Sequence, residues 1–272
     1  MLELVHLLPN IVILILTVIL FAGAAYVSPF VGRRLGLKVD DDRDQASFDA
    51  FKAVMAMAGV VLAFSLVQAE NNLRGDQAVV GRESSAMMIT DRVLFRIGDP
   101  EMIKSRQLLR DFGQSQLSQD WPSLVSGQGR SVATDIAFSR LSKAVRSYEP
   151  ESKRQEVMYA EIIKAMDDIA DARETLIQDA NAQLPPFFWI MALSFVLLGL
   201  ILGLFCKPSI TRATALGGTA AGIGLLLSFV LIVDAPFHGE TSVKPKPIHN
   251  ALILNARRGQ AAEGLPLPPE DR

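Results

Sequence analysis

Four apolar runs divide the chain of 272 residues. They cover residues 11–27, 53–69, 187–205 and 213–233, and none of them contains a charged side chain. A helix needs roughly 20 apolar residues to cross a bilayer core of about 30 Å. Backbone polar groups find no water in hydrocarbon, so each run is predicted to be a helix. We therefore expect four membrane spans.

The ends of these runs carry helix signals. The first run is preceded by Glu3 and His6 without a Lys or Arg, which is typical of a retained span rather than a cleaved signal peptide. The third run follows Pro185 and Pro186, and prolines fit a first helical turn because its N–H groups have no partner there. Only the short link from Cys206 to Arg212 separates the third and fourth runs, which predicts an antiparallel hairpin.

The stretch between the second and third runs, residues 70–183, carries most of the charge and has helical spacing. An apolar stripe at three- to four-residue steps contains Tyr159, Ile162, Met166, Ile169 and Leu176. Helices are predicted over 70–97, 101–117, 132–148 and 151–183. The breaks between them are Gly98–Pro100, the segment from Trp121-Pro122 to Gly129, and Glu149-Pro150. We expect the second and third spans to continue into this bundle.

The predicted fold class is therefore all-α, with two spans on each side of an inserted helical bundle. Residues 1–69 hold the first transmembrane pair, 70–183 the polar insert, and 184–234 the second pair. Residues 235–272 form a tail that is expected to be disordered after about residue 248, because it is rich in proline and charge.

Composition excludes several classes of protein. The net charge is −2, so no basic surface for nucleic acid is expected. The single cysteine, Cys206, permits no internal disulfide and is interpreted as a small apolar residue near the lipid interface. The expected partners are the lipid bilayer, inorganic ions and further copies of the chain.

No catalytic motif, metal site or cofactor site is predicted. The aspartates at 40, 41, 42 and 44 lack the glycine and the terminal glutamate of a calcium loop. The histidines at 6, 238 and 249 have no ligand spacing. The acidic residues of the insert are interpreted as solvated helix faces, and neither a nucleophile–base pair nor a glycine-rich phosphate loop is present. We expect no enzyme.

The second span is mildly polar at its end, where Ser65 and Gln68 lead to Glu70 and Asn71. Polar rings near a mouth select ions in pores, so these four residues are the candidate pore-lining set. The alternative is that they only mark the end of the span.

Asp234 is the ionisable residue nearest to the interior of a span. Pro236 and Gly239 follow it, so its carboxylate either fixes the exit of the chain from the membrane or has a functional role. Two glycine pairs, Gly199 with Gly203 and Gly218 with Gly222, are four residues apart and are candidate helix-packing positions within the chain or between subunits.

Loop charges predict the orientation. The loop after the first span holds Arg33, Arg34, Lys38, Arg43 and Lys52, and the link before the fourth span holds Lys207 and Arg212. The positive-inside rule then places both loops in the cytoplasm. In a bacterial inner membrane the helical insert would lie outside the cytoplasm, although Lys244, Lys246, Arg257 and Arg258 in the tail favour the opposite orientation.

Three stretches together resemble the bestrophin-like family of bacterial membrane proteins, a domain of unknown function. They are AFSLVQAENNL with Arg82, Glu83 and Ser84; DDIADARETLIQDANAQLPPFFWIMAL; and LIVDAPFHGETSVKPKPI. Asp120-Trp121-Pro122 also fits, and the resemblance covers about residues 10–250. At Ala235 many relatives would have an arginine, which weakens any charge role at that position.

The resemblance implies kinship with bestrophins, oligomeric chloride channels that also place two spans on each side of a helical segment. It therefore implies an oligomeric ion channel or pore subunit. The alternative is a non-transporting interaction or sensor protein that acts through its insert. Bestrophins keep their helical segment in the cytoplasm, in conflict with the loop charges, and we follow the loop charges.

Overall fold

The computed structural model describes residues 9–180, 184–234, 236–237 and 239–262. These residues form helices and connecting loops without a strand, which confirms the all-α fold class. Contacts divide the chain into two compact units. We call residues 1–73 with 183–242 the spanning unit, and residues 74–182 with 243–272 the insert unit.

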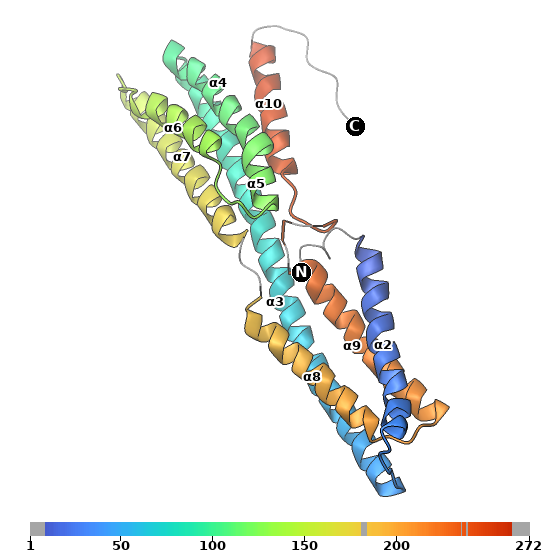
Figure 1. Cartoon of the computed structure of the whole chain (residues 1–272). Helices are drawn as coiled ribbons and strands as arrows, with labels where there is room; N and C mark the ends of the chain where they lie inside the picture. Colours follow the sequence, from blue (N-terminus) through green and yellow to red (C-terminus); the bar gives the residue numbers. More distant parts are fainter. Residues whose placement is uncertain (1–8, 181–183, 235, 238, 263–272) are drawn as a thin grey trace. The chain divides into compact units, whose positions relative to one another are not determined.

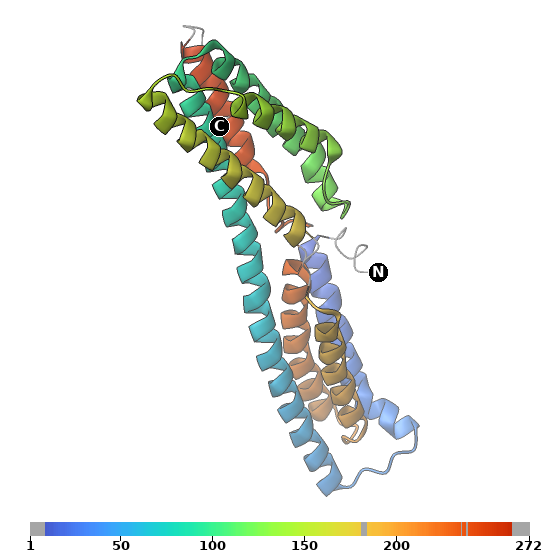
Figure 2. The same cartoon turned by 90° about the vertical axis from the view of Figure 1, so that its left-hand side faces the viewer.

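The spanning unit contains α2 (Asn10–Arg34), the first part of α3 (Asp41–Ile97), α8 (Pro186–Leu204) and α9 (Ile210–Val233). All four helices are long and apolar enough to cross a membrane. Each predicted span lies in one of them, so the four-span arrangement is confirmed. Figures 1 and 2 both show α9 beside α2.

An apolar core joins the four helices of the spanning unit. Phe51 and Met55 of α3 pack in one cluster with Ala25 of α2, Phe188 of α8 and Leu216 of α9. Close helix approach occurs at glycines: a Cβ added at Gly32 of α2 would meet the backbone of Leu204. Between apolar helices in lipid, such close backbone contact is a main source of association.

The insert unit contains the remainder of α3, α4 (Pro100–Ser115), a π turn η1 (Gln116–Asp120), α5 (Trp121–Val125), α6 (Val132–Arg146), α7 (Lys153–Asp179) and α10 (Lys246–Ala262). In α7, Ile162, Met166, Ile169 and Leu176 of the predicted stripe are buried. The spacing therefore identified the inner face of this helix correctly.

α3 is one helix from residue 41 to residue 97, as predicted for the second span and its continuation. The third span does not continue in the same way. α7 ends at Asp179, earlier than predicted, and α8 begins at Pro186, while residues 181–183 of the predicted helix lie outside the described residues. Pro185 has an extended backbone, because the residue before a proline is forced out of the helical region and Pro186 follows it.

The break predicted from Trp121-Pro122 to Gly129 begins later than expected: Gly127 and Gly129 lie in the connection after α5, but Trp121 and Pro122 are helical. The chain passes from α4 through η1 into α5, and the turn comes only at Ser126. The N–H of Trp121 donates to the carbonyl of Gln116, five residues earlier. This wider π turn accommodates a proline that would otherwise clash with the carbonyl four residues before it.

The expectation of disorder after residue 248 is contradicted by α10. Ile248, Ala251 and Asn255 are buried at three- to four-residue spacing, and Leu252 lies against Gly113 of α4. The segment has an amphipathic face that composition alone does not reveal. The predictions for His6, Ala235, His238 and the last ten residues of the tail lie outside the described residues.

Candidate functional site

A buried polar network occupies the core of the insert unit. Its members come from four elements: Glu83 from α3, Gln116 and Asp120 from η1, Asp135 from α6, and Arg173 from α7. Four of these side chains are less than a tenth exposed: Glu83, Gln116, Asp120 and Arg173. The sequence segments around Glu83, Asp120 and Arg173 are therefore brought together in one place by the fold.

Helix spacing explains why these charged side chains point inward. Arg173 follows Ile169 by four residues and precedes Leu176 by three, so it lies on the apolar face of α7. Glu83 follows Val79 and precedes Met87 by four residues each, and both of these side chains are buried. The two charges occupy positions at which the helix pattern otherwise places apolar residues.

Arg173 is held by two carboxylates. Its Nε donates to Asp120 Oδ2 at 2.5 Å and its Nη2 to Asp120 Oδ1 at 3.1 Å, while Nη1 donates to Asp135 Oδ1 at 2.6 Å. The Asp120 contact is bidentate, the strongest arrangement for an arginine–carboxylate pair. Burial, the largest single cause, lowers the pKa of Arg173, but the hydrogen bonds and charges of Asp120 and Asp135 together raise it above its ordinary value.

Glu83 is fully buried, and Gln116 Nε2 donates to its Oε1. Neither the other carboxyl oxygen, Oε2, nor the amide oxygen of Gln116 has a hydrogen-bond partner among the described residues. Burial raises the pKa of Glu83 to about 7; Asp120 adds to this, and the Gln116 amide and the Arg173 charge oppose it.

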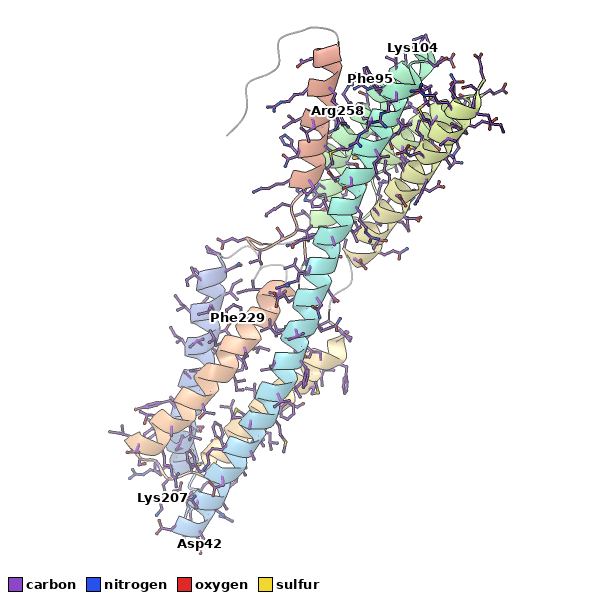
Figure 3. All side chains as sticks on the ribbon, turned by 180° about the vertical axis from the view of Figure 1, so that it is seen from behind. Asp42, Phe95, Lys104, Lys207, Phe229 and Arg258 are labelled. Carbon is purple, nitrogen blue, oxygen red and sulfur yellow. The ribbon has the colours of Figure 1, made fainter. Side chains whose placement is uncertain are left out.

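A second charged cluster joins α10 to α3 and α4 within the insert unit. Arg106 of α4 donates through Nε and Nη2 to the two carboxyl oxygens of Asp91, at 2.8 and 3.2 Å. Its Nη2 also reaches the carbonyl of Asn255 in α10 at 3.4 Å, and its guanidinium lies 5.1 Å from the Phe95 ring. Figure 3 labels Phe95 and Arg258 in this region, and Arg258 lies 3.8 Å from Asp91.

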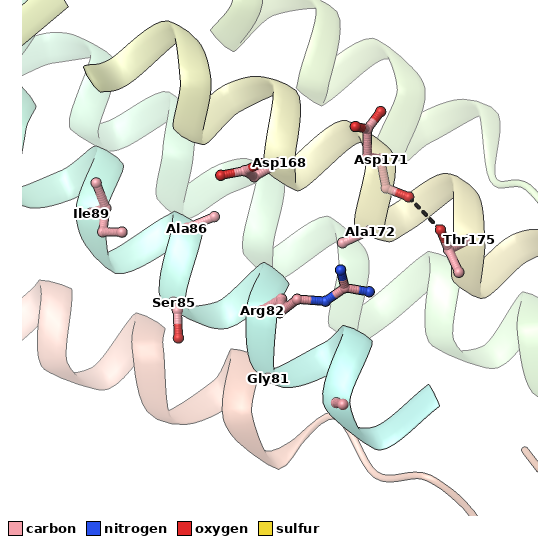
Figure 4. A pocket seen from close by; sticks show the side chains of 10 residues that line it. Gly81, Arg82, Ser85, Ala86, Ile89, Asp168, Asp171, Ala172 and Thr175 are labelled. Atoms are coloured by element: carbon pink, nitrogen blue, oxygen red, sulfur yellow. Dashed lines mark hydrogen bonds between the residues drawn. The ribbon is translucent and has the colours of Figure 1, made fainter. Parts of the chain in front are cut away.

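A half-open groove of about 640 Å³ lies between α3 and α7 within the insert unit. Figure 4 shows Arg82 and Ser85 on one wall and Asp168, Asp171 and Thr175 on the other. The hydroxyl of Thr175 donates to the backbone carbonyl of Asp171. Small side chains and mixed charge line this groove, and no set of convergent donors or acceptors defines a particular ligand.

The candidate pore residues of α3 have different surroundings. Gln68, Glu70 and Asn71 are exposed, and Gln68 Nε2 donates to the side chain of Asn72 at 2.9 Å. Ser65 is partly buried, and its hydroxyl donates to the carbonyl of Val61. Ser65 is therefore engaged by its own helix, whereas Gln68 and Asn71 are directed away from the rest of the spanning unit.

The four candidate packing glycines divide into two pairs. A Cβ at Gly199 would meet Met55 and Phe51 of α3, and one at Gly203 would meet Ser28 of α2. A Cβ at Gly218 or Gly222 would meet nothing within 4 Å. In α9 the close contacts with α2 are made instead by Gly217 and Gly224, which the sequence did not single out.

Asp234 lies directly after α9, and its Oδ1 accepts a hydrogen bond of 2.7 Å from the backbone N–H of Leu184. This bond connects the segment before α8 with the end of α9. It joins two stretches, LPP and D-x-P, that lie 50 residues apart in sequence.

Three aspartates before and in the first turn of α3 accept hydrogen bonds from a backbone N–H or from cationic side chains. Asp40 caps the helix by accepting from the N–H of Arg43 at 2.8 Å, and Asp41 pairs with Lys207. Asp44, 6% exposed, accepts from the Lys207 N–H and from the Arg212 guanidinium. Figure 3 labels Lys207 near the start of α3.

Cys206, the residue before Lys207, is buried in the apolar cluster of the spanning unit. Among the described residues, no group of three His, Cys, Asp or Glu is placed to hold a metal ion.

These features define a class: a helical membrane protein with four spans and an inserted helical unit. The sequence matches the model of the Bestrophin-like domain over residues 15–248, so the chain belongs to the bestrophin-like family. None of the curated proteins matches it.

Solved structures share the fold. A bacterial bestrophin homolog from Klebsiella pneumoniae, solved by zinc phasing, is 15% identical, with a TM-score of 0.64 over 94% of this chain and 99% of the other. A point variant of that homolog is 14% identical, with a TM-score of 0.67 over 92% and 98%. A structure described as a membrane protein variant is 16% identical, with a TM-score of 0.65 over 95% and 99%.

Proposed function

We propose that this chain is a pore-forming subunit of an oligomeric ion channel in a bacterial inner membrane, with α3 lining the pore. Bestrophins are oligomeric anion channels, and the chain shares their fold and belongs to the bestrophin-like family. The shared fold supports the proposal but does not supply the activity, because similar folds serve different functions.

The observation that carries the proposal is an exposed apolar stripe on α3. Met57, Val60, Phe64 and Val67 are 60%, 57%, 74% and 56% exposed and lie at three- to four-residue steps on one helix face. The stripe leads directly to the exposed amides of Gln68 and Asn71. An apolar constriction followed by a polar mouth is an arrangement by which pores gate and admit ions.

One chain cannot enclose such a path. Only 17–22% of the apolar windows of α2, α3 and α8 is buried within the chain, and α9, at 50%, is packed among the others. If several copies place their α3 stripes around one axis, these side chains line a pore. If the stripe faces lipid, the same side chains need no further partner. A substitution in the stripe changes ion flux only in the first arrangement.

The test is ion flux through purified full-length protein in liposomes, together with the mass of the oligomer in detergent. Replacing Phe64 by Ala removes the bulkiest side chain of the stripe and is expected to raise flux several-fold. Phe187 of α8 is the matched control, since it is 72% exposed but lies on another helix. Phe187→Ala is expected to leave flux unchanged.

Two results would contradict the proposal. A monomer without flux would exclude the pore, and equal flux from both phenylalanine variants would remove α3 from its lining. A stable oligomer that carries neither anions nor cations would favour the second candidate, a non-transporting interaction or sensor protein. The observation that favours this candidate is the buried polar network of the insert unit, which lies outside the spans.

For orientation, we propose that the loop after α2 and the link between α8 and α9 face the cytoplasm. Both lie at the same end of the spanning unit, because Asp41 and Asp44 contact Lys207 and Arg212. Cysteine labelling from each side of the membrane, at an introduced Cys in the insert, tests this: labelling from the cytoplasmic side would reverse the orientation.

A further inference from the structure

Two buried oxygen atoms of the insert unit lack a partner, and they belong to side chains that already touch. Gln116 Nε2 donates to Glu83 Oε1, which leaves Glu83 Oε2 and Gln116 Oε1 without a hydrogen bond among the described residues. Both side chains are at most 3% exposed. An acceptor buried in this way without a partner destabilises the fold, and a buried charge does so more.

A single proton removes both deficits. On Glu83 Oε2 it turns an acceptor into a donor, and the nearby acceptor without a partner is Gln116 Oε1. The carboxylic acid and the amide then form a ring with two hydrogen bonds, O–H to the amide oxygen and N–H to the acid carbonyl. Every polar atom of the pair is satisfied, and no charge is buried.

We propose that Glu83 and Gln116 form a proton-binding site that couples α3 to the π turn η1. The proton comes from solvent and returns to it. Gln116 and Asp120 are the first and last residues of η1, and they bind Glu83 and Arg173 respectively. One turn of the chain therefore contacts the proton site at one end and the arginine of the network at the other.

Burial, rather than the neighbouring charges, favours the neutral acid. The groups that act on Glu83 are Asp120 of η1, which opposes its ionisation, and Arg173 of α7, which favours it. Arg173 is already committed to Asp120 and, through Nη1, to Asp135 of α6. α10 contacts the neighbouring Ser84 through the carbonyl of Pro247, a neutral group. When Glu83 ionises, it competes with Asp120 for Arg173 and weakens the hold on η1.

The direction of the pH effect follows from the raised affinity for the proton. Burial, the largest cause, raises the pKa of Glu83 from 4.5 to about 7 in the folded chain. A group whose pKa is higher in the folded state contributes stability that is complete below its unfolded pKa and is lost as the pH rises through the folded value. The insert unit should therefore be tighter in mild acid than above neutral pH.

A second carboxyl on α3 supplies the control. Asp76, 3% exposed, also has a pKa raised to about 7, by burial and then by the carboxyl of Asp179 in α7. It is an aspartate and lies seven residues from Glu83, so isotope labels and single substitutions separate the two groups.

The experiment is infrared spectroscopy of the full-length protein in detergent, with ¹³C-labelled glutamate, during a titration from about pH 5 to about pH 9. We expect a protonated-carboxyl band that shifts with the glutamate label and disappears through about pH 7. Glu83→Gln should abolish the band, and Asp76→Asn should leave it. Gln116→Met should move the band to higher frequency, because the acid then loses its hydrogen-bond acceptor.

Stability gives an independent readout. The melting temperature of the wild type should fall as the pH rises through about 7. Glu83→Gln should reduce this fall, since its amide makes the same ring at every pH, and the contribution of Asp76 should remain. The absence of a glutamate band in the wild type below pH about 6 would overturn the proposal and assign the two oxygens to a bound water or cation. Persistence of the band in Glu83→Gln would also overturn it. The wild-type titration decides the matter even if a variant does not fold.

Discussion

The two units of the chain bury polar groups in opposite ways. In the spanning unit the shared core cluster consists of apolar side chains, and buried charge lies at an end, where Asp44 binds Arg212. In the insert unit Arg173 and Asp120 pair within the core and are 9% and 5% exposed. The same chain therefore builds one core almost without polar atoms and another around an ion pair.

The surroundings explain the difference. Lipid tails are as apolar as leucine, so helices in a membrane gain little from burying apolar surface and associate by close packing. Gly32 and Gly203 allow that approach in the spanning unit. Apolar burial in water drives folding strongly, so the insert unit can accommodate a buried ion pair that contributes little net stability.

The largest expected effect comes from removing the cation of the network. Arg173→Ala leaves Asp120 buried without its partner, which is expected to destabilise the folded chain by about 3–5 kcal/mol. Thermal unfolding of the purified protein measures the change. The comparison between units predicts that the spanning helices remain folded while the insert unit loses protease resistance.

The matched control is Arg146→Ala. Arg146 pairs with Asp167 at 3.0 Å, but the two side chains are 55% and 60% exposed. Such a surface pair is worth about 0–1 kcal/mol. If both arginine variants lose the same stability, burial of the network is not what distinguishes the insert unit.

The spanning unit should respond most to added volume. A Cβ at Gly32 would meet the backbone of Leu204, which cannot rotate away as a side chain can. Gly32→Ala should therefore push α2 from α8 and cost about 1–3 kcal/mol. Gly23→Ala on the same helix is the control, because nothing lies within 4 Å of the added atom. Unfolding temperatures in detergent should fall for the first variant only, and equal values would refute the close-packing explanation.

The contrast between the units also explains what could be predicted from the sequence. Spans are specified by long apolar runs, and all four were found because hydropathy needs no tertiary information. α7 was found from its stripe at Ile162, Met166 and Ile169. The start of α8 was predicted from Pro185-Pro186, whereas the end of α7 at Asp179 was not, because helical spacing was extended beyond it.

The polar network could not be read in the same way. Arg173 and Glu83 occupy apolar-face positions of their helices, and this irregularity was the available signal. Their partners Gln116 and Asp120 are separated from Glu83 by more than 30 residues, and a π turn brings them into register. The periodicity of a single sequence does not show where a π turn occurs or which distant side chains it brings together. Similarly, the spacing of Gly218 and Gly222 cannot tell which face of α9 meets α2.

The smallest expected effect concerns Asp234, at the end of α9 in the spanning unit. Its Oδ1 accepts from the Leu184 N–H at 2.7 Å, so the bond holds the approach to α8 against the exit from α9. In Asp234→Asn an amide oxygen still accepts this hydrogen bond but without the charge, and the loss of stability should be about 0.5–1.5 kcal/mol.

Assembly in detergent and ion flux in liposomes, measured on one sample, separate a structural role of Asp234 from a role in the ion path. A lower unfolding temperature with unchanged flux per oligomer is the result expected of a structural carboxylate. Intact assembly with altered flux would instead make Asp234 part of the ion path and would end the description of the spanning unit as a core without functional charge.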